Sequence, residues 1–123
     1  MKNTNQVFFK FPRELRVLRG IEFSNVFAKP LRIGNKAFTV LARKNNLNHP
    51  RLGLAIAKKQ VKLAVKRNLI KRKVRESFRL TQRDIPNCDF IVMVRRDIND
   101  MDRVDISKAL DHIWRKANKI CDG

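Results

Sequence analysis

The fold is governed by one strongly patterned stretch, Lys66-Arg67-Asn68-Leu69-Ile70-Lys71-Arg72-Lys73-Val74-Arg75-Glu76-Ser77-Phe78-Arg79. Within it, Ile70, Val74 and Phe78 recur at i, i+4 and i+8, which is the spacing of the apolar stripe on an amphipathic helix. The pattern predicts a helix over residues 63–80 that packs one face against the rest of the protein.

The remaining surface of this helix carries a dense positive charge, with Glu76 as its only acid. Like charges four residues apart destabilise a helix by about 0.2–0.5 kcal/mol per pair, so a merely solvated face would interleave acids. Phosphate binding is favoured instead, because arginine offers phosphate two parallel donors and Asn68 can bond a sugar or a base edge. The basic residues of this region are Lys58, Lys59, Lys62, Lys66, Arg67, Lys71, Arg72, Lys73, Arg75 and Arg79. Four of them are expected to be exposed and to contact phosphate: Arg67, Lys71, Arg72 and Arg75.

The segments on either side contain strand patterns. Residues 36–43 and 51–57 alternate apolar with other residues, and the turn-rich residues 45–50 between them suggest a hairpin. In the first run the alternation sets Phe38, Val40 and Ala42 on one face and Thr39 and Leu41 on the other. Residues 31–34 could add a short strand. Residues 90–94 are a continuous apolar run, typical of a strand covered on both faces.

Two further helices are predicted near the ends of the chain. Phe23, Val26 and Phe27 stand at i, i+3 and i+4 in residues 21–29, before Pro30. Residues 105–119 place Ile106, Leu110, Ile113 and Ala117 on one face. The order helix, three strands, helix, strand, helix predicts an α+β fold, a sandwich of helices packed on one sheet. The length of 123 residues and the lack of linkers predict a single domain over residues 1–123, with its core at about 12–119 and short tails.

Charge restricts the class of partner. The chain holds 29 Lys and Arg against 11 Asp and Glu, a net charge of +18. Such a balance favours a polyanion, with nucleic acid first and an anionic membrane second. No run of about 18 apolar residues is present to span a bilayer, and residues 1–11 do not resemble a signal peptide. We therefore expect a cytoplasmic protein with Cys88 and Cys121 as reduced thiols. Composition alone leaves RNA and DNA open.

The motifs resemble those of the bacterial ribonuclease P protein family. The family's basic signature is Arg-Asn, two residues, Lys-Arg, two residues, Arg-Glu or Arg-Gln, which matches Arg67-Asn68, Lys71-Arg72 and Arg75-Glu76. The strand Arg51-Leu-Gly-Leu-Ala-Ile-Ala-Lys-Lys59, the helix with paired Phe23 and Phe27, and Asp89-Phe-Ile-Val-Met-Val94 resemble family segments in the same order. The likeness covers about residues 12–119. It departs from many members at residues 61–64, where a Gly-Asn-Ala is usual, and at Leu41, where some carry an aromatic.

The resemblance implies that the chain is the non-catalytic subunit of an endoribonuclease whose RNA hydrolyses precursor tRNA and removes its 5′ leader. It implies no metal and no small molecule bound by the protein, with Mg²⁺ in the RNA-containing holoenzyme. It also implies an unusual left-handed crossover near the basic motif, against the usual rule. The residues implied to bind the catalytic RNA are Lys58, Lys59, Lys66, Arg67, Asn68, Lys71, Arg72, Arg75 and Arg79. Those implied to bind the leader of precursor tRNA are Phe23, Phe27, Lys36 and Phe38.

Two rival classes have weaker support in the residues. A self-sufficient nuclease needs clustered carboxylates with a metal or a histidine base. His49 and His112 fall in different elements, and Asp97, Asp100, Asp102 and Asp105 are better explained as loop and helix-start acids. A ribosomal or nucleoid architectural protein would share the charge but not the ordered motif.

Overall fold

The computed structural model describes residues 20–122, with side-chain surroundings up to residue 120. Its elements are α2 (Gly20–Ala28), β1 (Leu31–Gly34), β2 (Phe38–Lys44), β3 (Arg51–Ala55), α3 (Ala64–Thr81), β4 (Cys88–Val94), the 3-10 helix η1 (Arg96–Asp100) and α4 (Arg103–Asp122). The predicted order is confirmed, with η1 as an addition that the sequence patterns did not indicate. The predicted N-terminal tail at residues 1–11, the start of the predicted core at residues 12–19 and the Cys121 side chain lie outside the described residues.

The four strands form one sheet in the order β1-β2-β4-β3. β1 and β2 pair antiparallel, β2 and β4 pair antiparallel, and β3 and β4 pair parallel. The hairpin predicted between residues 36–43 and 51–57 is therefore wrong, because β4 lies between these strands. β4 is the most apolar strand and is buried along nearly its whole length, so it gains most from a central position.

The observed hairpin joins β1 and β2 instead, and Asn35 closes it. The side-chain Oδ1 of Asn35 accepts hydrogen bonds from the backbone N–H of Ala37 at 3.0 Å and of Phe38 at 2.9 Å. Such a side-chain bond to nearby backbone is the usual reason for asparagine in turns. The β3–α3–β4 connection joins adjacent parallel strands, and its left-handed sense stays a prediction from the resemblance.

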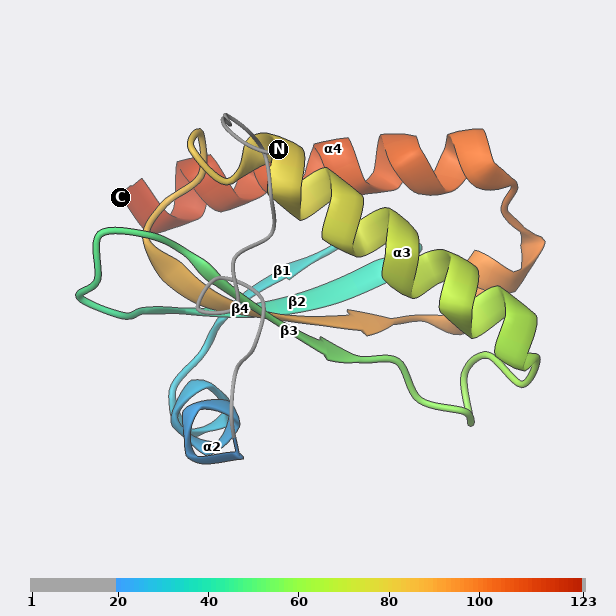
Figure 1. The fold of residues 1–123 in the computed structure, drawn as a ribbon, viewed down its shortest axis with the longest axis horizontal. Coiled ribbons are helices and arrows are strands. Elements are labelled where there is room, and N and C mark those ends of the chain that lie inside the picture. Colours follow the sequence, from blue (N-terminus) through green and yellow to red (C-terminus); the bar gives the residue numbers. More distant parts are fainter. Residues whose placement is uncertain (1–19, 123) are drawn as a thin grey trace, which may run out of the picture.

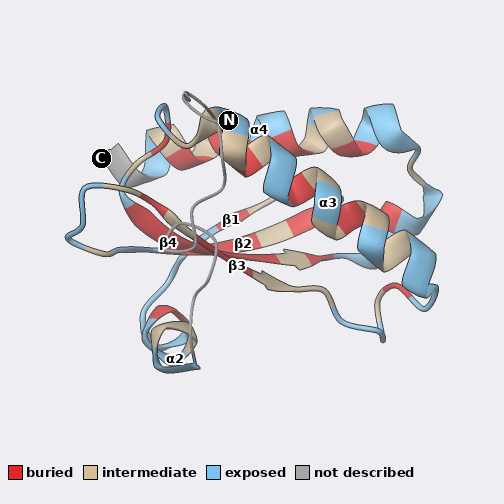
Figure 2. Cartoon of the chain, in the orientation of Figure 1, coloured by how far each residue is buried: buried red, intermediate tan, exposed pale blue. Residues whose placement is uncertain are grey.

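Helices cover the two faces of the sheet unequally. α3 and α4 lie together on one face and α2 lies on the other (Figure 1). The stripe Ile70, Val74 and Phe78 of α3 is fully buried against the sheet, as predicted. Trp114 of α4 packs its ring edge-on to Phe90, with centroids 5.5 Å apart. Buried residues thus concentrate between the sheet and this helix pair (Figure 2).

The alternation predicted for β2 is confirmed by its neighbours. Phe38, Val40 and Ala42 belong to the main core under α3 and α4. Leu41 points the other way and forms a small second cluster with Val26 of α2 and Ile91 of β4. The sheet therefore separates a large core from a small one.

Candidate RNA interface

The exposed face of α3 carries the densest positive surface of the described chain. Asn68, Arg72 and Arg75 are exposed, while Lys71 and Arg79 are partly covered. An advance of about 100° per residue puts Asn68, Arg72, Arg75 and Arg79 within one narrow stripe of the helix. Arg79 of this stripe forms a loose ion pair with Glu76, at 3.8 Å. The stripe can therefore present several guanidinium groups to one phosphate backbone.

Three other basic residues of this helix are occupied by the protein itself. Arg67 Nη1 donates to the carbonyl oxygens of Val61 at 2.9 Å and Lys62 at 2.8 Å. On the flank toward α4, Lys66 Nζ donates to the Met101 carbonyl at 3.0 Å, and Lys73 Nζ donates to Ser107 Oγ at 2.8 Å. The expectation of exposure holds for Arg72 and Arg75 and is wrong for Arg67 and Lys71, which are partly buried. Arg67 is drawn inward because it lies at the end of the apolar stripe, beside the loop.

That loop has a defined shape even though its sequence departs from the family pattern. Gln60 and Val61 both donate their N–H to the Ala57 carbonyl, at 3.0 and 3.1 Å. Val61 is fully buried, so it anchors the loop in the main core. Lys58 and Lys59, in the turn just before it, are exposed.

The residues expected to bind the leader do not all share one surface. Phe23 and Phe27 stack on α2 with ring centroids 6.4 Å apart. Phe23 is partly buried, and Phe27 is 49% exposed. Phe38 is fully buried in the main core on the opposite face of the sheet, so the prediction that it binds the leader is wrong. Lys36 is exposed in the β1–β2 turn.

A hollow opens on the α2 side of the sheet, next to this helix. Thr39 and Met93 are cross-strand partners, and Met93 packs against the small cluster beneath α2. The hollow has a volume of about 760 Å³, and no acid is among the residues that line it: Arg32, Gly34, Thr39, Lys59, Gln60, Met93, Val94, Arg95 and Arg96. Sequence reasoning had included only Lys59 of this set. The alternation in β2 was the available signal, because it put Thr39 and not Phe38 on this face.

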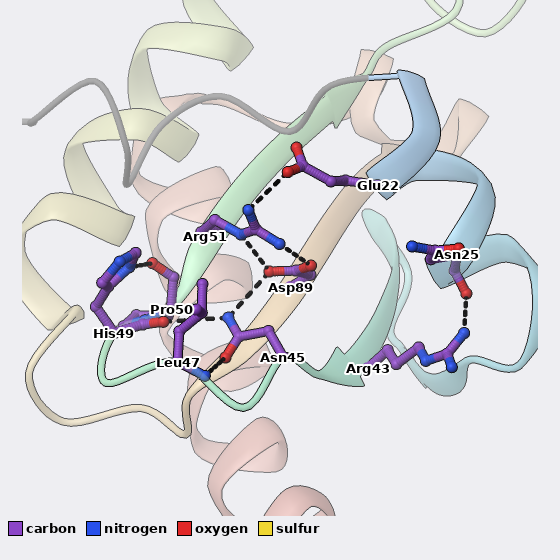
Figure 3. A network of polar contacts seen from close by, with 9 residues as sticks. All are labelled: Glu22, Asn25, Arg43, Asn45, Leu47, His49, Pro50, Arg51 and Asp89. Carbon is purple, nitrogen blue, oxygen red and sulfur yellow. Dashed lines mark hydrogen bonds and ion pairs between the residues drawn. The ribbon is translucent and has the colours of Figure 1, made fainter.

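A polar network lies between α2 and the sheet (Figure 3). Arg51 binds Asp89 through two parallel hydrogen bonds, Nε to Oδ1 at 2.8 Å and Nη2 to Oδ2 at 2.7 Å. Arg51 Nη1 donates to Glu22 Oε2 at 2.7 Å. Asn45 Nδ2 donates to Asp89 Oδ1 at 3.0 Å, which ties the β2–β3 loop to the same carboxylate. The network joins α2, β3, β4 and this loop.

The charge of Arg51 in this network does not depend on ordinary changes of pH. The hydrogen bond to Asp89 raises the pKa of Arg51 above its ordinary value, against the opposing effect of burial, and the charges of Asp89 and Glu22 raise it further. A raised pKa means that the pairing stabilises the fold below the ordinary arginine value and is lost only as pH rises through the higher one. The guanidinium therefore stays charged throughout the neutral range.

The residues weighed for catalysis are separate. His49 Nδ1 lies 3.1 Å from the Pro50 carbonyl oxygen in the β2–β3 loop, whereas His112 is exposed on α4. Asp102 Oδ1 accepts the N–H of Asp105 at 2.8 Å and so caps the start of α4. Within residues 20–120, whose side chains the structure describes, no group of three or more His, Cys, Asp and Glu side chains is placed to hold a metal ion. No helix in that range is long and apolar enough to cross a membrane.

The basic stripe, the hollow and the aromatic pair on this sheet define a class, that of small α+β proteins built to bind nucleic acid. Sequence similarity to known proteins shows which family of that class the chain belongs to. The Ribonuclease P family model matches residues 11–118, so the chain belongs to the ribonuclease P protein family. It is 49% identical to the ribonuclease P protein component of Cronobacter sakazakii over 113 residues, which cover 92% of this chain and 95% of that one. The Escherichia coli component is 46% identical with the same coverage.

Solved structures agree with the sequence relatives. The ribonuclease P protein of Staphylococcus aureus superposes with a TM-score of 0.76 at 33% identity, covering 83% of this chain and 94% of that one. The Thermotoga maritima protein superposes with a TM-score of 0.73 at 29% identity, covering 82% and 96%. The chain is thus a protein component of bacterial ribonuclease P, the accessory subunit of an endoribonuclease in tRNA 5′ processing, and its partner is the ribonuclease P RNA.

Proposed function

We propose that this subunit works in the cytoplasm with two separate RNA surfaces, one for the catalytic RNA and one for the 5′ leader of precursor tRNA. The exposed stripe of α3 is the first surface, because it presents Asn68, Arg72 and Arg75 with Arg79 beside them. Lys58, which is exposed after β3, extends that surface. Lys66 and Arg67 act on it indirectly, through their bonds to the Met101 carbonyl and to the 61–62 loop.

The hollow beside α2 carries the second assignment. Its basic lining attracts phosphates, and Phe27, on the helix that covers the same face of the sheet, is exposed enough to stack on a base. Stacking and phosphate contacts tolerate any base sequence, which is what binding to leaders of differing sequence requires. Phe23 forms the partly buried base of the aromatic pair, and Lys36 supplies charge from the β1–β2 turn.

The chemistry is assigned to the RNA, with Mg²⁺ held in the RNA-containing holoenzyme and no cofactor on the polypeptide. Two acids have structural roles, since Asp89 pairs with Arg51 and Asp102 caps α4. The protein contributes binding energy to the precursor and neutralises phosphates where two RNA molecules approach.

Reconstitution tests this division of labour. Protein and catalytic RNA together should bind leader-bearing precursor tRNA more tightly than mature tRNA and cleave it, while the protein alone should leave it intact. Arg32→Ala with Arg95→Ala should lower precursor affinity by about tenfold or more, since each charged hydrogen bond contributes roughly 1.5–3 kcal/mol. Arg103→Ala with Arg115→Ala, both exposed on α4, is the matched removal of two charges. Equal affinity for precursor and mature tRNA in the wild-type complex would refute leader binding by the protein.

A further inference from the structure

Few apolar contacts hold α2 to the sheet. This nine-residue helix buries one side chain completely, Val26, over Leu41 and Ile91. Phe23 packs at the edge of that cluster and stays partly exposed. A short helix that rests on one buried residue can roll about that contact unless something else fixes its orientation. The apolar cluster alone therefore does not determine which way the aromatic pair faces.

The positions of the α2 side chains around the helix divide it into two flanks. At about 100° per residue, Val26 lies between Glu22 and Asn25 on one side and Phe23 and Phe27 on the other. Because the helix is rigid, contacts that hold the Glu22 and Asn25 flank also fix where the Phe23 and Phe27 flank points. The aromatic pair is thus oriented by whatever holds Glu22 and Asn25.

Two arginines of the sheet hold that first flank. Arg51 Nη1 bonds Glu22 Oε2 at 2.7 Å, and Arg43 Nη1 donates to the carbonyl oxygen of Asn25 (Figure 3). Arg51 is itself held by the two-bond contact with Asp89, whose side chain is 9% exposed. A planar guanidinium fixed on one edge by a carboxylate has little freedom to follow a moving partner. We call Glu22, Arg51 and Asp89 the α2 clamp.

The sheet register places the clamp and the hollow on opposite sides of the helix. Arg43, Asp89 and Arg51 are cross-strand partners and form one row of the α2 face. Thr39, Met93 and Ala55 are likewise partners, four residue pairs further along, and Thr39 and Met93 line the hollow. The Leu41–Ile91 row beneath Val26 lies between them. The flank opposite the clamp accordingly faces the hollow.

We propose that the α2 clamp sets the roll of α2 and thereby aims Phe23 and Phe27 at the leader in the hollow. Arg51 and Glu22 are then positioning residues for precursor recognition, although neither touches the substrate. The inference rests on the proposed leader site and adds to it the device that orients its aromatic wall.

Glu22→Ala tests the clamp with little disturbance of the sheet, because the Arg51–Asp89 pair between β3 and β4 is left in place. Precursor affinity of the reconstituted enzyme should fall by about tenfold relative to mature tRNA, comparable to removing one base stack. Affinity for the catalytic RNA should stay unchanged. Glu22→Gln keeps an acceptor for Arg51 and should restore most of the preference, and Asp111→Ala on α4 is the matched removal of one acid.

A double-mutant cycle shows whether Glu22 acts through Arg51. Arg51→Lys loses the planar group that binds Asp89 and Glu22 together, so adding Glu22→Ala to it should lower precursor affinity little further. If the two residues acted independently, their fold-losses in affinity would multiply. The clamp is overturned if Glu22→Ala keeps the wild-type preference for precursor over mature tRNA, or if the affinity losses of Glu22→Ala and Arg51→Lys multiply in the double variant. It is also overturned if Glu22→Ala loses affinity equally for both tRNAs and has a lowered melting temperature. A wild-type enzyme without any precursor preference would instead defeat the leader site itself, so the two failures are distinguishable. All affinities are measured well below the melting temperature of each variant.

Discussion

On one face of the sheet, α3 and α4 bury a continuous core of aliphatic side chains around Phe78, Phe90 and Trp114. On the other face, the buried cluster that the described residues form under α2 is Val26 with Leu41 and Ile91, and arginines hold the flank of this helix. Burial of apolar surface supplies most folding energy, so the first face stabilises the molecule. Among the described residues, the second face buries fewer apolar side chains and carries the hollow. The residues that maintain the fold are thus largely separate from those that we propose to bind the leader.

The claim that the two faces contribute unequally to stability is tested most directly by truncating one fully buried side chain on each face. Phe78→Ala should cost about 3–5 kcal/mol of unfolding free energy, because it empties a fully buried site beside Trp114. Val26→Ala removes fewer buried carbons and should cost roughly 1–2 kcal/mol. Denaturant unfolding of both variants measures the ratio. Similar losses would mean that the α2 face is as much a part of the stable core as the α3 face.

Charge removal on α3 should separate binding from stability. Arg72→Ala with Arg75→Ala should weaken binding of the catalytic RNA by about tenfold or more, since both side chains are exposed and charged hydrogen bonds contribute roughly 1.5–3 kcal/mol each. The slope of affinity against salt should flatten by about 0.7–0.9 for each phosphate that the variant no longer neutralises. Titrations at several salt concentrations, with Arg115→Ala as the control, measure both. An unchanged slope would remove these arginines from the phosphate interface.

Arg67→Ala tests a basic residue of α3 that bonds the protein itself, in contrast to the exposed Arg72 and Arg75. Its guanidinium holds the Val61 and Lys62 carbonyls, so its removal should lower the melting temperature as well as the affinity for RNA. We expect stability to fall by about 1–3 kcal/mol, the usual cost of leaving buried or partly buried acceptors unpaired. A variant that keeps wild-type stability but loses RNA affinity would place Arg67 directly on the RNA.

The aromatic pair of α2 should behave in the opposite way to Phe78. Phe27→Ala removes a half-exposed ring, so it should barely change stability while lowering precursor affinity by about 1–3 kcal/mol for each base that the ring stacks on. Phe23→Ala should do both, because that ring is partly buried. Melting temperature and affinities for precursor and mature tRNA are measured together. Losses that do not distinguish the two tRNAs would return these rings to a purely structural role.

The smallest effects are expected at the scattered acids and histidines. Ala replacement of Asp97, Asp100, His49 or His112 should leave cleavage by the reconstituted enzyme nearly intact, whereas removal of a true general acid or base lowers the rate by about 10²-fold or more. Asp102→Ala should cost about 1 kcal/mol of stability because it removes the cap of α4, but not activity. A large drop in rate in a folded, RNA-binding variant would make the polypeptide a catalyst.

Local periodicity predicted the elements well and their pairing poorly. The stripe of Ile70, Val74 and Phe78 and the order of the elements followed from spacing alone. The neighbours of β3 did not, because strand pairing is decided by which strand gains most from the centre of the sheet. Apolar content identified β4 as doubly covered, yet the turn-like residues 45–50 suggested a hairpin that the sheet does not contain.

The sequence predicted the candidate RNA-binding residues that lie together on one helix. It did not predict those that several elements bring together in the hollow. Arg72 and Arg75 were found from a single motif, whereas Arg32, Arg95 and Arg96 come together only through the sheet. Phe38 was predicted from the family resemblance to bind the leader together with Phe23 and Phe27, and this prediction is wrong because the ring is buried in the main core. Its own strand alternation, which separates it from Thr39 and Leu41, already put it on the other face.

The strand order β1-β2-β4-β3 has a consequence for how the molecule is made. β4 is synthesised after the other strands and yet occupies the middle of the sheet, pairing with both β2 and β3. Contacts between distant parts of a chain form slowly, because their loop entropy is lost before they contribute any stability. During translation β1 and β2 can pair, but β3 has no partner strand and the sheet beneath α3 is incomplete until residues 88–94 emerge. We expect the nascent chain to carry its most basic helix incompletely packed, in reach of any polyanion, until synthesis is nearly over.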